Sequence, residues 1–278
     1  MIVTRFAPSP TGYLHLGHAY SALFAEAQAR KADGRFLLRI EDIDTARCRP
    51  EYEAAIIEDL SWLGLKWDGS IRRQSDHTDD YQAALSRLER MGVTYPCFCS
   101  RKEIAAAASA PHGPVRVYPG TCRNRTPQDR FDRILAGQPY AVRLNVEAGL
   151  ARTGPLAWQD RIAGIVPATP EREGDPVIAR RDTPTSYHLS VTVDDHLQGI
   201  TLVTRGEDLF AATHVHRLLQ GLLGYETPEY HHHPLLKNVD GVRLSKRDGA
   251  VAVRALRERG SRSDEVRAMC SWPTASTP

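Results

Sequence analysis

The chain has 278 residues, enough for one large domain or for a large domain that carries a small insertion. It is 41% hydrophobic and 25% charged, as is ordinary for a soluble globular protein, and its net charge of +2 does not in itself indicate a nucleic-acid binder. No apolar run approaches the roughly 18 residues of a membrane span, and no charged-then-apolar leader opens the chain.

The first 40 residues predict a βαβ unit. Residues 2–7 are a short, mostly apolar run ended by prolines, residues 19–31 are rich in alanine, and residues 35–40 are again apolar. The crossover of such a unit makes its two strands parallel, and ligands bind at the carboxyl ends of these strands. We therefore expect four residues at this edge of the sheet: Ser9, His15, His18 and Glu41.

The texture of the sequence changes in the middle of the chain. Residues 51–63 and 79–91 predict helices, but from about residue 95 to 185 cysteines, prolines and arginine-rich loops replace the regular periodicity. Within that stretch residues 140–146 predict a strand. We interpret the stretch as an insertion between two halves of a sheet.

A residue pattern typical of a buried core then resumes. Residues 187–194 and 199–204 are rich in β-branched residues and predict strands, and residues 211–223 predict a helix. The expected organisation has four parts: the first half of a nucleotide-binding catalytic domain (1–94), an inserted subdomain (95–185), the second half of the catalytic domain (186–250) and a short helical or frayed tail (251–278).

Two short motifs can bind phosphate. In His15-Leu-Gly-His18 the two rings can direct donors at one phosphate, Gly17 lets the backbone approach it, and a helix N-terminus adds favourable potential. Far downstream, Lys246 in Arg243-Leu-Ser-Lys-Arg247 is a compact charge on a loop that can close over the same phosphates. Taken singly, either histidine is more often a capping or core residue.

Together these motifs resemble the paired signature of class I aminoacyl-tRNA synthetases, and residues 5–12 and 193–208 resemble the glutamyl branch. The resemblance covers residues 1–250 and implies an α/β fold, a Rossmann-type doubly wound parallel sheet with an inserted zinc-containing subdomain. It implies activation of L-glutamate by ATP with Mg²⁺, with His15, His18 and Lys246 as catalytic residues. The implied ATP-binding residues are His15, Gly17, His18, Arg243, Leu244, Ser245, Lys246 and Arg247.

The lysine loop departs from the family's Lys-Met-Ser-Lys-Ser pattern. Arg243 replaces the first lysine and Arg247 replaces the final serine, while Lys246 matches the second lysine. The effect of these two arginines on the loop stays open. Basic residues also crowd the chain from Arg243 on, either as a solvated helix face or as a source of phosphate contacts.

A glutamate substrate brings a side-chain carboxylate that a buried site must pair with a cation. Arg5 and Arg205, each at a predicted strand end, could form a bidentate fork, although a single arginine is more often part of a surface ion pair. Glu41 could hold the α-ammonium group. The resemblance implies this glutamate-binding set: Arg5, Phe6, Ala7, Pro8, Ser9, Glu41, Tyr187 and Arg205.

Three cysteines in the poorly hydrophobic middle stretch favour a structural zinc, with three unligated thiols as the alternative. Chemistry favours His112 as the fourth ligand, because tyrosine is a rare one. The Cys-x-Cys…Tyr-x-x-x-Cys spacing, however, resembles the zinc knuckle of the shortened glutamyl-tRNA synthetase paralogues, in which the tyrosine is a ligand. This resemblance implies one Zn²⁺ per chain, held by Cys97, Cys99, Tyr118 and Cys122.

The total of five cysteines is odd, which fits a reducing cytoplasm better than a disulfide framework, and we expect a cytoplasmic location. Two further clusters carry alternatives. His231-His-His233 could bind metal, but a structural or adenine-side role is favoured. Asp194-Asp195 could suggest a magnesium site, and we interpret this pair as a turn at the end of a strand near the substrate pocket.

The resemblance also implies an acceptor. Full glutamyl-tRNA synthetases continue well past the lysine loop into anticodon-binding domains, whereas here only residues 248–278 follow it, as in the shortened paralogues. Those enzymes adenylate glutamate without tRNA and transfer it to the queuosine of the tRNA(Asp) anticodon, and we expect a monomer that does the same. The alternatives are a truncated glutamyl-tRNA synthetase that charges a tRNA 3′ end and a non-catalytic relic that binds tRNA or a partner.

Overall fold

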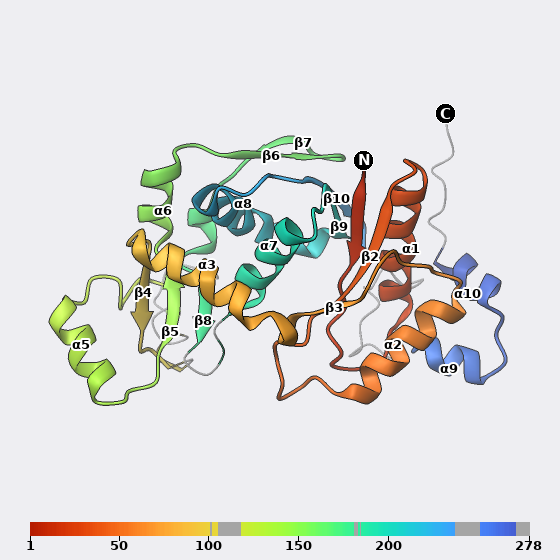
Figure 1. Cartoon of the computed structure of the whole chain (residues 1–278), viewed down its shortest axis with the longest axis horizontal. Coiled ribbons are helices and arrows are strands. Elements are labelled where there is room, and N and C mark those ends of the chain that lie inside the picture. The colour runs from red at the N-terminus through yellow and green to blue at the C-terminus, as the bar shows by residue number, and fades with distance from the viewer. Residues whose placement is uncertain (101, 105–117, 181–182, 184, 237–250, 271–278) are drawn as a thin grey trace. The chain divides into compact units, whose positions relative to one another are not determined.

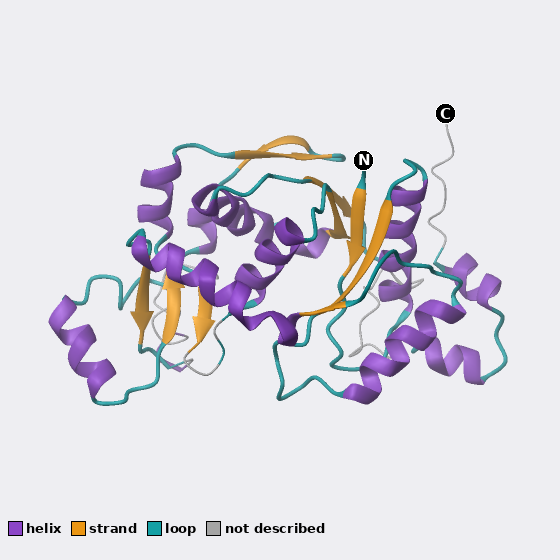
Figure 2. Cartoon of the chain, in the orientation of Figure 1, coloured by secondary structure: helices purple, strands orange, loops and turns teal. Residues whose placement is uncertain are grey.

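The structure, a computed structural model, describes residues 1–100, 102–104, 118–180, 183, 185–236 and 251–270. The chain forms two compact units (Figures 1 and 2). Three segments make the first unit: Met1–Asp76, Ile200–Leu209 and Pro228–Pro278. Two segments make the second: His77–Gly199 and Phe210–Thr227. The four-part organisation expected from the sequence stays a prediction beside these two units.

The first unit is built on parallel strands. The predicted βαβ unit is confirmed as β1 (Val3–Phe6), α1 (Leu16–Arg30) and β2 (Arg35–Ile40), with Val3 opposite Arg35 in a parallel register. The two-residue strand β3 (Arg72–Arg73) extends this sheet beyond β2. All four residues of β1 are buried, as expected for a parallel strand that is covered on both faces.

A second parallel pair lies beside β1 within the same unit. The amide of Thr201 donates to the carbonyl of Val3 over 3.0 Å, which brings β9 (Leu202–Gly206) alongside β1. The strand β10 (Glu229–His233) then pairs with β9 in parallel. The first unit is completed by four helical elements: α2 (Pro50–Trp62), η3 (Glu207–Leu209), α9 (Val253–Glu258) and α10 (Ser263–Met269).

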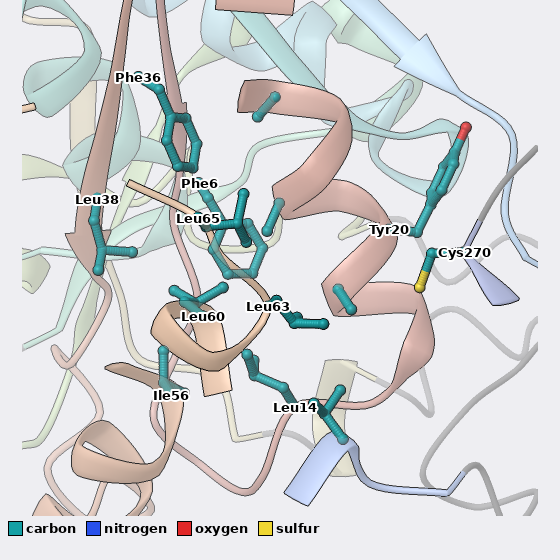
Figure 3. Packing of buried hydrophobic residues seen from close by; sticks show 14 of the residues in the cluster. Phe6, Leu14, Tyr20, Phe36, Leu38, Ile56, Leu60, Leu63, Leu65 and Cys270 are labelled. Carbon is teal, nitrogen blue, oxygen red and sulfur yellow. The ribbon is translucent and has the colours of Figure 1, made fainter. Parts of the chain in front are cut away.

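Gly34 makes the turn between α1 and β2 possible. A Cβ atom at this position would lie 2.1 Å from the carbonyl oxygen of Ile2, so no other residue fits without moving the backbone. Helix α1, β2 and α2 then enclose an apolar core (Figure 3). Leu14, which comes just before α1, is 1% exposed and joins this core together with Val253 of α9.

The second unit contains antiparallel strands. Its three-stranded sheet has the order β4 (Thr94–Cys97), β5 (Ala141–Leu144), β8 (Val177–Arg180), and β6 (Ala157–Asp160) forms a hairpin with β7 (Gly164–Pro167). The expected parallel sheet therefore describes the first unit, and the sheets of the whole chain are mixed. The helical elements of this unit are α3 (Thr78–Arg90), α5 (Pro127–Leu135), α6 (Val146–Thr153), η2 (Pro170–Glu173), α7 (Tyr187–Leu197) and α8 (Ala212–Leu223); η1 (Gln74–His77) spans the boundary between the units.

The prediction of a strand at residues 187–194 is wrong, because this stretch is helix α7. Every residue from Leu189 to Asp195 is buried, and a helix enclosed on all sides lacks the polar face that produces a 3.6-residue periodicity. In the sequence alone, its β-branched residues therefore indicate a strand. The Thr192 hydroxyl donates to the His188 carbonyl over 2.8 Å, which satisfies this polar group inside the helix.

The interpretation of Asp194-Asp195 as a turn at a strand end fails with it. Both residues lie in the last turns of α7, and Asp194 accepts hydrogen bonds of 2.9 and 3.0 Å from the Tyr81 hydroxyl of α3. The predicted strand at 140–146 is shorter, since β5 ends at Leu144 and α6 begins at Val146. Among the described residues, no helix has both the length and the apolarity that crossing a bilayer would require.

Candidate active site and metal centre

The two histidines of the first motif lie at the N-terminus of α1. His15 is the N-cap residue, and its Nδ1 accepts the amide hydrogen of Gly17 over 3.1 Å. The Nδ1 of His18 in turn accepts the amide hydrogen of His15 over 3.2 Å, so the two residues form a reciprocal capping box. Their rings stack with centroids 3.7 Å apart.

This capping arrangement fixes the chemistry of both rings. A neutral imidazole whose Nδ1 accepts a hydrogen bond carries its proton on Nε2, so each ring is a donor through Nε2. A Cβ at Gly17 would lie 3.0 Å from Cε1 of His15, so any larger residue here would push against the His15 ring. Capping and phosphate binding are therefore not alternatives for these histidines, because Nδ1 and Nε2 can serve the two roles at once.

Two buried arginines lie on neighbouring strands of the first unit. Arg5 on β1 and Arg205 on β9 are each 6% exposed, and Nη1 of Arg5 donates to the carbonyl of Thr204 over 3.2 Å. This bond holds the Arg5 guanidinium against the backbone just before Arg205. Nε of Arg205 donates to Nε2 of His232 over 3.2 Å, and its guanidinium carbon lies 5.5 Å from the ring centre of Tyr230.

His232 supports Arg205, a contact that the sequence did not predict, although it indicated a structural role for the triple-histidine tract. Because Nε2 of His232 accepts a hydrogen bond from Arg205, its neutral ring carries the proton on Nδ1. His232 therefore binds the guanidinium without placing a second positive charge beside it. The register of β10 against β9 places His232 directly opposite Arg205. Only the pairing of the two strands reveals this contact.

Glu41 follows β2 and has a partner within its own segment. Its Oε1 lies 3.2 Å from Nη2 of Arg39, whose side chain is fully buried. The Glu41 amide donates to the carbonyl of Pro8 over 3.0 Å, which joins the loop after β1 to the loop after β2. Alternation along a strand puts residues 39 and 41 on one face, so the sequence did contain a signal for this pair.

The remaining predicted glutamate-binding residues are distributed as follows. Phe6 ends β1 and is buried in the core; Ala7 and Pro8 continue the chain, and Ser9 is exposed. Tyr187 opens α7 in the second unit, where its ring centre lies 5.5 Å from those of His188 and His216. The lysine-loop residues Arg243, Leu244, Ser245, Lys246 and Arg247 lie outside the described residues.

The triple-histidine tract lies on β10, where each histidine has a different surrounding. His233 Nε2 lies 3.0 Å from the Ser21 hydroxyl of α1, and its ring meets Tyr20 edge-on at 4.8 Å. The ring of His231 meets Phe24 edge-on at 4.7 Å. Burial lowers the pKa of His233, which favours the neutral ring. These contacts agree with the structural role that the sequence analysis favoured over metal binding.

Three cysteines of the second unit gather into one cluster. Among the described residues, only Cys97, Cys99 and Cys122 form a group of three potential metal ligands, with sulfur atoms within 4.8 Å of one another. The hydroxyl of Tyr118 joins them, 3.3 Å from Sγ of Cys97 and 3.7 Å from Sγ of Cys99. The runner-up ligand His112 lies outside the described residues.

The spacing of these atoms fits a tetrahedral zinc ion. Zinc bonds of about 2.3 Å to sulfur and about 2.0 Å to oxygen give tetrahedron edges of about 3.8 Å between sulfurs and about 3.5 Å between sulfur and oxygen. Sγ of Cys99 and Sγ of Cys122 are 3.5 Å apart, close to such an edge and far beyond a disulfide bond of about 2.0 Å. All five cysteines of the chain are free thiols.

Arginines lie beside the cluster. Burial opposes ionisation of Cys122, but several hydrogen bonds to this thiol, the strongest with Arg125, together outweigh burial and lower its pKa to about 7. Burial raises the pKa of Cys99 to about 11. The Arg143 guanidinium carbon lies 3.7 Å from the ring centre of Tyr118, a cation–π contact. Burial and a hydrogen bond with Cys97 raise the pKa of Tyr118, which favours the neutral phenol. Neither arginine could be predicted from the sequence, because only folding brings them to the cysteines.

Comparison with known proteins places these features in a family context. A family model described as the catalytic domain of class I tRNA synthetases (E and Q) matches residues 1–270. A Glutamyl-Q tRNA(Asp) synthetase from Rhodobacter capsulatus is 49% identical over 278 aligned residues, which cover 96% of this chain and 98% of that protein.

Longer relatives are also similar. A glutamate–tRNA ligase from Aquifex aeolicus is 43% identical over 93% of this chain, which spans 54% of the length of that protein. The crystal structure of a glutamate tRNA ligase from Elizabethkingia meningosepticum, in complex with its amino acid, superposes with a TM-score of 0.76 at 29% identity. That match covers 89% of this chain and 52% of the other.

Proposed function

The chain belongs to the family of class I tRNA synthetases for glutamate and glutamine, and we propose that it activates L-glutamate with ATP in the absence of tRNA. We propose further that it transfers the activated glutamate to the queuosine of the tRNA(Asp) anticodon. The observation that carries this proposal is the similarity to a Glutamyl-Q tRNA(Asp) synthetase along nearly the whole length of both chains. The arrangement of buried arginines and N-terminal histidines in the first unit supports the activation step.

In the proposed activation step the α-carboxylate of glutamate attacks the α-phosphate of ATP, and the bond to pyrophosphate breaks. Negative charge accumulates on phosphoryl oxygens, so the enzyme contributes by positioning and electrostatic stabilisation. His15 and His18 would donate from Nε2 while their Nδ1 atoms cap α1. ATP would enter with Mg²⁺, and Lys246 would stabilise the leaving pyrophosphate.

In the same proposal the two buried arginines select the amino acid. A side-chain carboxylate between Arg5 and Arg205 would accept hydrogen bonds from guanidinium groups whose other bonds, to Thr204 and His232, are already made. An amide in the same place would leave buried positive charge unpaired, which rejects glutamine. Glu41 would hold the α-ammonium group, with Ser9 adding a hydrogen bond.

In the transfer step a hydroxyl of the queuosine cyclopentenediol would attack the carbonyl carbon of glutamyl-adenylate. AMP leaves, and an ester forms. We propose that Cys97, Cys99, Tyr118 and Cys122 hold a structural Zn²⁺, which would join β4 to the segment around Tyr118 and stabilise the second unit rather than take part in the chemistry.

The first test is glutamate-dependent exchange between ATP and labelled pyrophosphate, run with Mg²⁺ and without tRNA. We expect exchange with glutamate and much slower exchange with glutamine or aspartate. Exchange only after tRNA is added would contradict activation without tRNA. Equal rates with glutamine and glutamate would overturn the assignment of Arg5 and Arg205.

The second test identifies the acceptor. Labelled glutamate is offered with tRNA(Asp) that carries or lacks queuosine, and in a parallel sample the 3′-terminal adenosine is trimmed. Labelling should require queuosine and survive trimming. The alternative, charging of a 3′ end, is favoured by the similarity to glutamate–tRNA ligases; it predicts labelling that disappears on trimming or appears on queuosine-free tRNA(Glu).

A further inference from the structure

Two helices of the first unit hold the segment that leads to His15. On one side Val253, the first residue of α9, donates its amide to the carbonyl of Leu14 over 2.8 Å, and Ala252 forms an antiparallel bridge with His15. Leu14 and Val253 are both fully buried in the same apolar core as Ile56 of α2. Figure 3 shows Leu14 and Ile56 in this core. The backbone that carries His15 is therefore bonded directly to the start of α9.

The same segment is also held through Tyr13. Its ring meets the ring of Tyr52 on α2 edge-on, with centroids 5.0 Å apart, and the guanidinium carbon of Arg254 on α9 lies 5.3 Å from its centre. Tyr13 is thus in contact with α2 and with α9 at once. A cation over an aromatic face and an edge-on ring pair are each stabilising contacts with a defined geometry.

Helix α9 has fewer than two turns, so its position depends on bonds to its neighbours. Arg257 supplies these bonds. Its Nη1 lies 2.8 Å from Oε1 of Glu58, and its Nη2 lies 3.6 Å from Oδ1 of Asp59, both on α2. Asp59 is fully buried, whereas Glu58 is exposed, so one guanidinium joins a surface carboxylate and an interior one.

From this geometry we propose that Arg257, held by Glu58 and Asp59, is a positioning residue: it fixes α9 against α2 and thereby the backbone and ring orientation of His15. The contacts run in sequence from Arg257 through α9 to Val253 and Leu14, and from there to His15. The Nδ1 of His15 accepts from Gly17 only while its backbone keeps the N-cap conformation. Releasing α9 therefore frees the ring to exchange its tautomers and moves the Nε2 donor.

The inference rests on the proposed function only for its kinetic consequence. We expect Arg257→Ala to lower kcat of glutamate-dependent pyrophosphate exchange by about tenfold or more, because small displacements of a catalytic group are costly. KM for glutamate should stay unchanged. Glu58→Gln should lower kcat in the same direction, and a double variant should add little to Arg257→Ala, since the two side chains act as one unit.

A matched control is Arg262→Ala. Arg262 pairs with Asp264 on the same C-terminal stretch, but both side chains are exposed, and its loss should leave exchange unchanged. If Arg257→Ala does not fold, Arg257→Gln keeps the aliphatic stem of the side chain and provides the same test without the charge.

The second readout is independent of activity. In ¹⁵N-histidine NMR spectra, with His15 assigned by His15→Gln, the unsubstituted protein should show Nε2 protonated and Nδ1 as acceptor. Arg257→Ala should shift the two nitrogens toward averaged values, and Arg262→Ala should not. An unchanged His15 tautomer in folded Arg257→Ala, or an unchanged kcat, overturns the proposal. Absence of exchange in the unsubstituted protein overturns the proposed function instead, and the NMR result then decides whether Arg257 positions His15.

Discussion

Arg205 shows how a single buried side chain can be prepared for a ligand. Its Nε is bound to His232 and its plane is fixed near Tyr230, so little side-chain entropy remains to be lost when a carboxylate binds. A lysine at this position would keep the charge but lose the planar fork. The identity of the residue, and not only its charge, is therefore expected to matter.

We predict that Arg205→Lys lowers kcat/KM for glutamate on the order of a hundredfold. This corresponds to a loss of about 3 kcal/mol of transition-state stabilisation, as expected when a buried charge pair loses its geometry. Steady-state exchange kinetics with varied glutamate measure this. Arg47→Lys, which alters an exposed ion pair with Asp44, is the control. A change of less than about twofold in Arg205→Lys would remove Arg205 from the glutamate site.

The cysteine cluster gives a prediction about metal content. Cys122→Ala should reduce the content from about one zinc per chain to nearly none, because a structural site needs all four of its ligands. Elemental analysis of the purified protein measures this, with Cys48→Ala as the matched control, since Cys48 lies outside the cluster. Comparison of Tyr118→Phe with His112→Ala decides the fourth ligand. Full zinc retention in Cys122→Ala would refute the ligand set.

At the scale of elements, the packing of α2 against α9 buries the carboxyl group of Asp59, which raises the free energy of its ionised form. Neither oxygen of Asp59 accepts a hydrogen bond from a described residue, although Arg257 is 3.6 Å away. Burial raises the pKa of Asp59 to about 6, with Arg257 opposing this shift and Glu58 adding to it. The folded protein therefore binds the proton of Asp59 more tightly than the unfolded chain does, although a pKa of about 6 still leaves Asp59 mostly ionised at pH 7.

This pKa gives a stability prediction with a defined sign. The folded state binds the proton of Asp59 more tightly than the unfolded state does, so the group stabilises the fold fully below about pH 4, and this contribution is lost as the pH rises through about 6. Relative to Asp59→Asn, the unsubstituted protein should lose about 2 kcal/mol of unfolding free energy between pH 4 and pH 8. Urea unfolding of both proteins at these two pH values measures the difference. A difference that does not vary with pH would show that Asp59 ionises normally.

At the scale of the whole molecule, four arginines of the described C-terminal residues, 251–270, have partners within the protein. Arg254 pairs with Glu258, Arg257 with Glu58 and Arg262 with Asp264, while Nη1 of Arg267 donates to the carbonyl of Leu63. These contacts favour the interpretation of this stretch as a charged helix surface. Any phosphate contacts from these arginines would have to compete with existing partners.

The two proposed steps should therefore differ in their response to salt. Pyrophosphate exchange involves small ligands and should change little between 50 and 200 mM salt, concentrations at which nucleic-acid binding weakens steeply. Transfer of glutamate to tRNA(Asp) should slow, because contacts with the phosphate backbone release counterions. Measuring both rates across this range tests the difference. A transfer rate as constant as the exchange rate would argue against phosphate contacts.

The sequence by itself determined the local features of this protein. The strand, helix and strand of the first 40 residues and the family resemblance depend on short-range patterns, and the cysteine and tyrosine spacing is a property of the chain. The βαβ prediction is confirmed because such a unit needs a fixed order of elements, whatever the rest of the chain does, while the zinc ligand set stays a prediction. Short-range patterns gave a wrong strand prediction at α7, because burial on all sides removed the helical periodicity on which such predictions depend.

Only the tertiary structure decided which residues support the predicted ones. His232 meets Arg205 through the register of two strands that are far apart in sequence, Arg143 covers Tyr118, and Arg257 reaches α2 from the C-terminal stretch. No spacing rule connects such residues, because the chain between them can follow many paths until the core forms. Packing and strand pairing select one of these paths, and with it the hydrogen bonds that orient each predicted side chain.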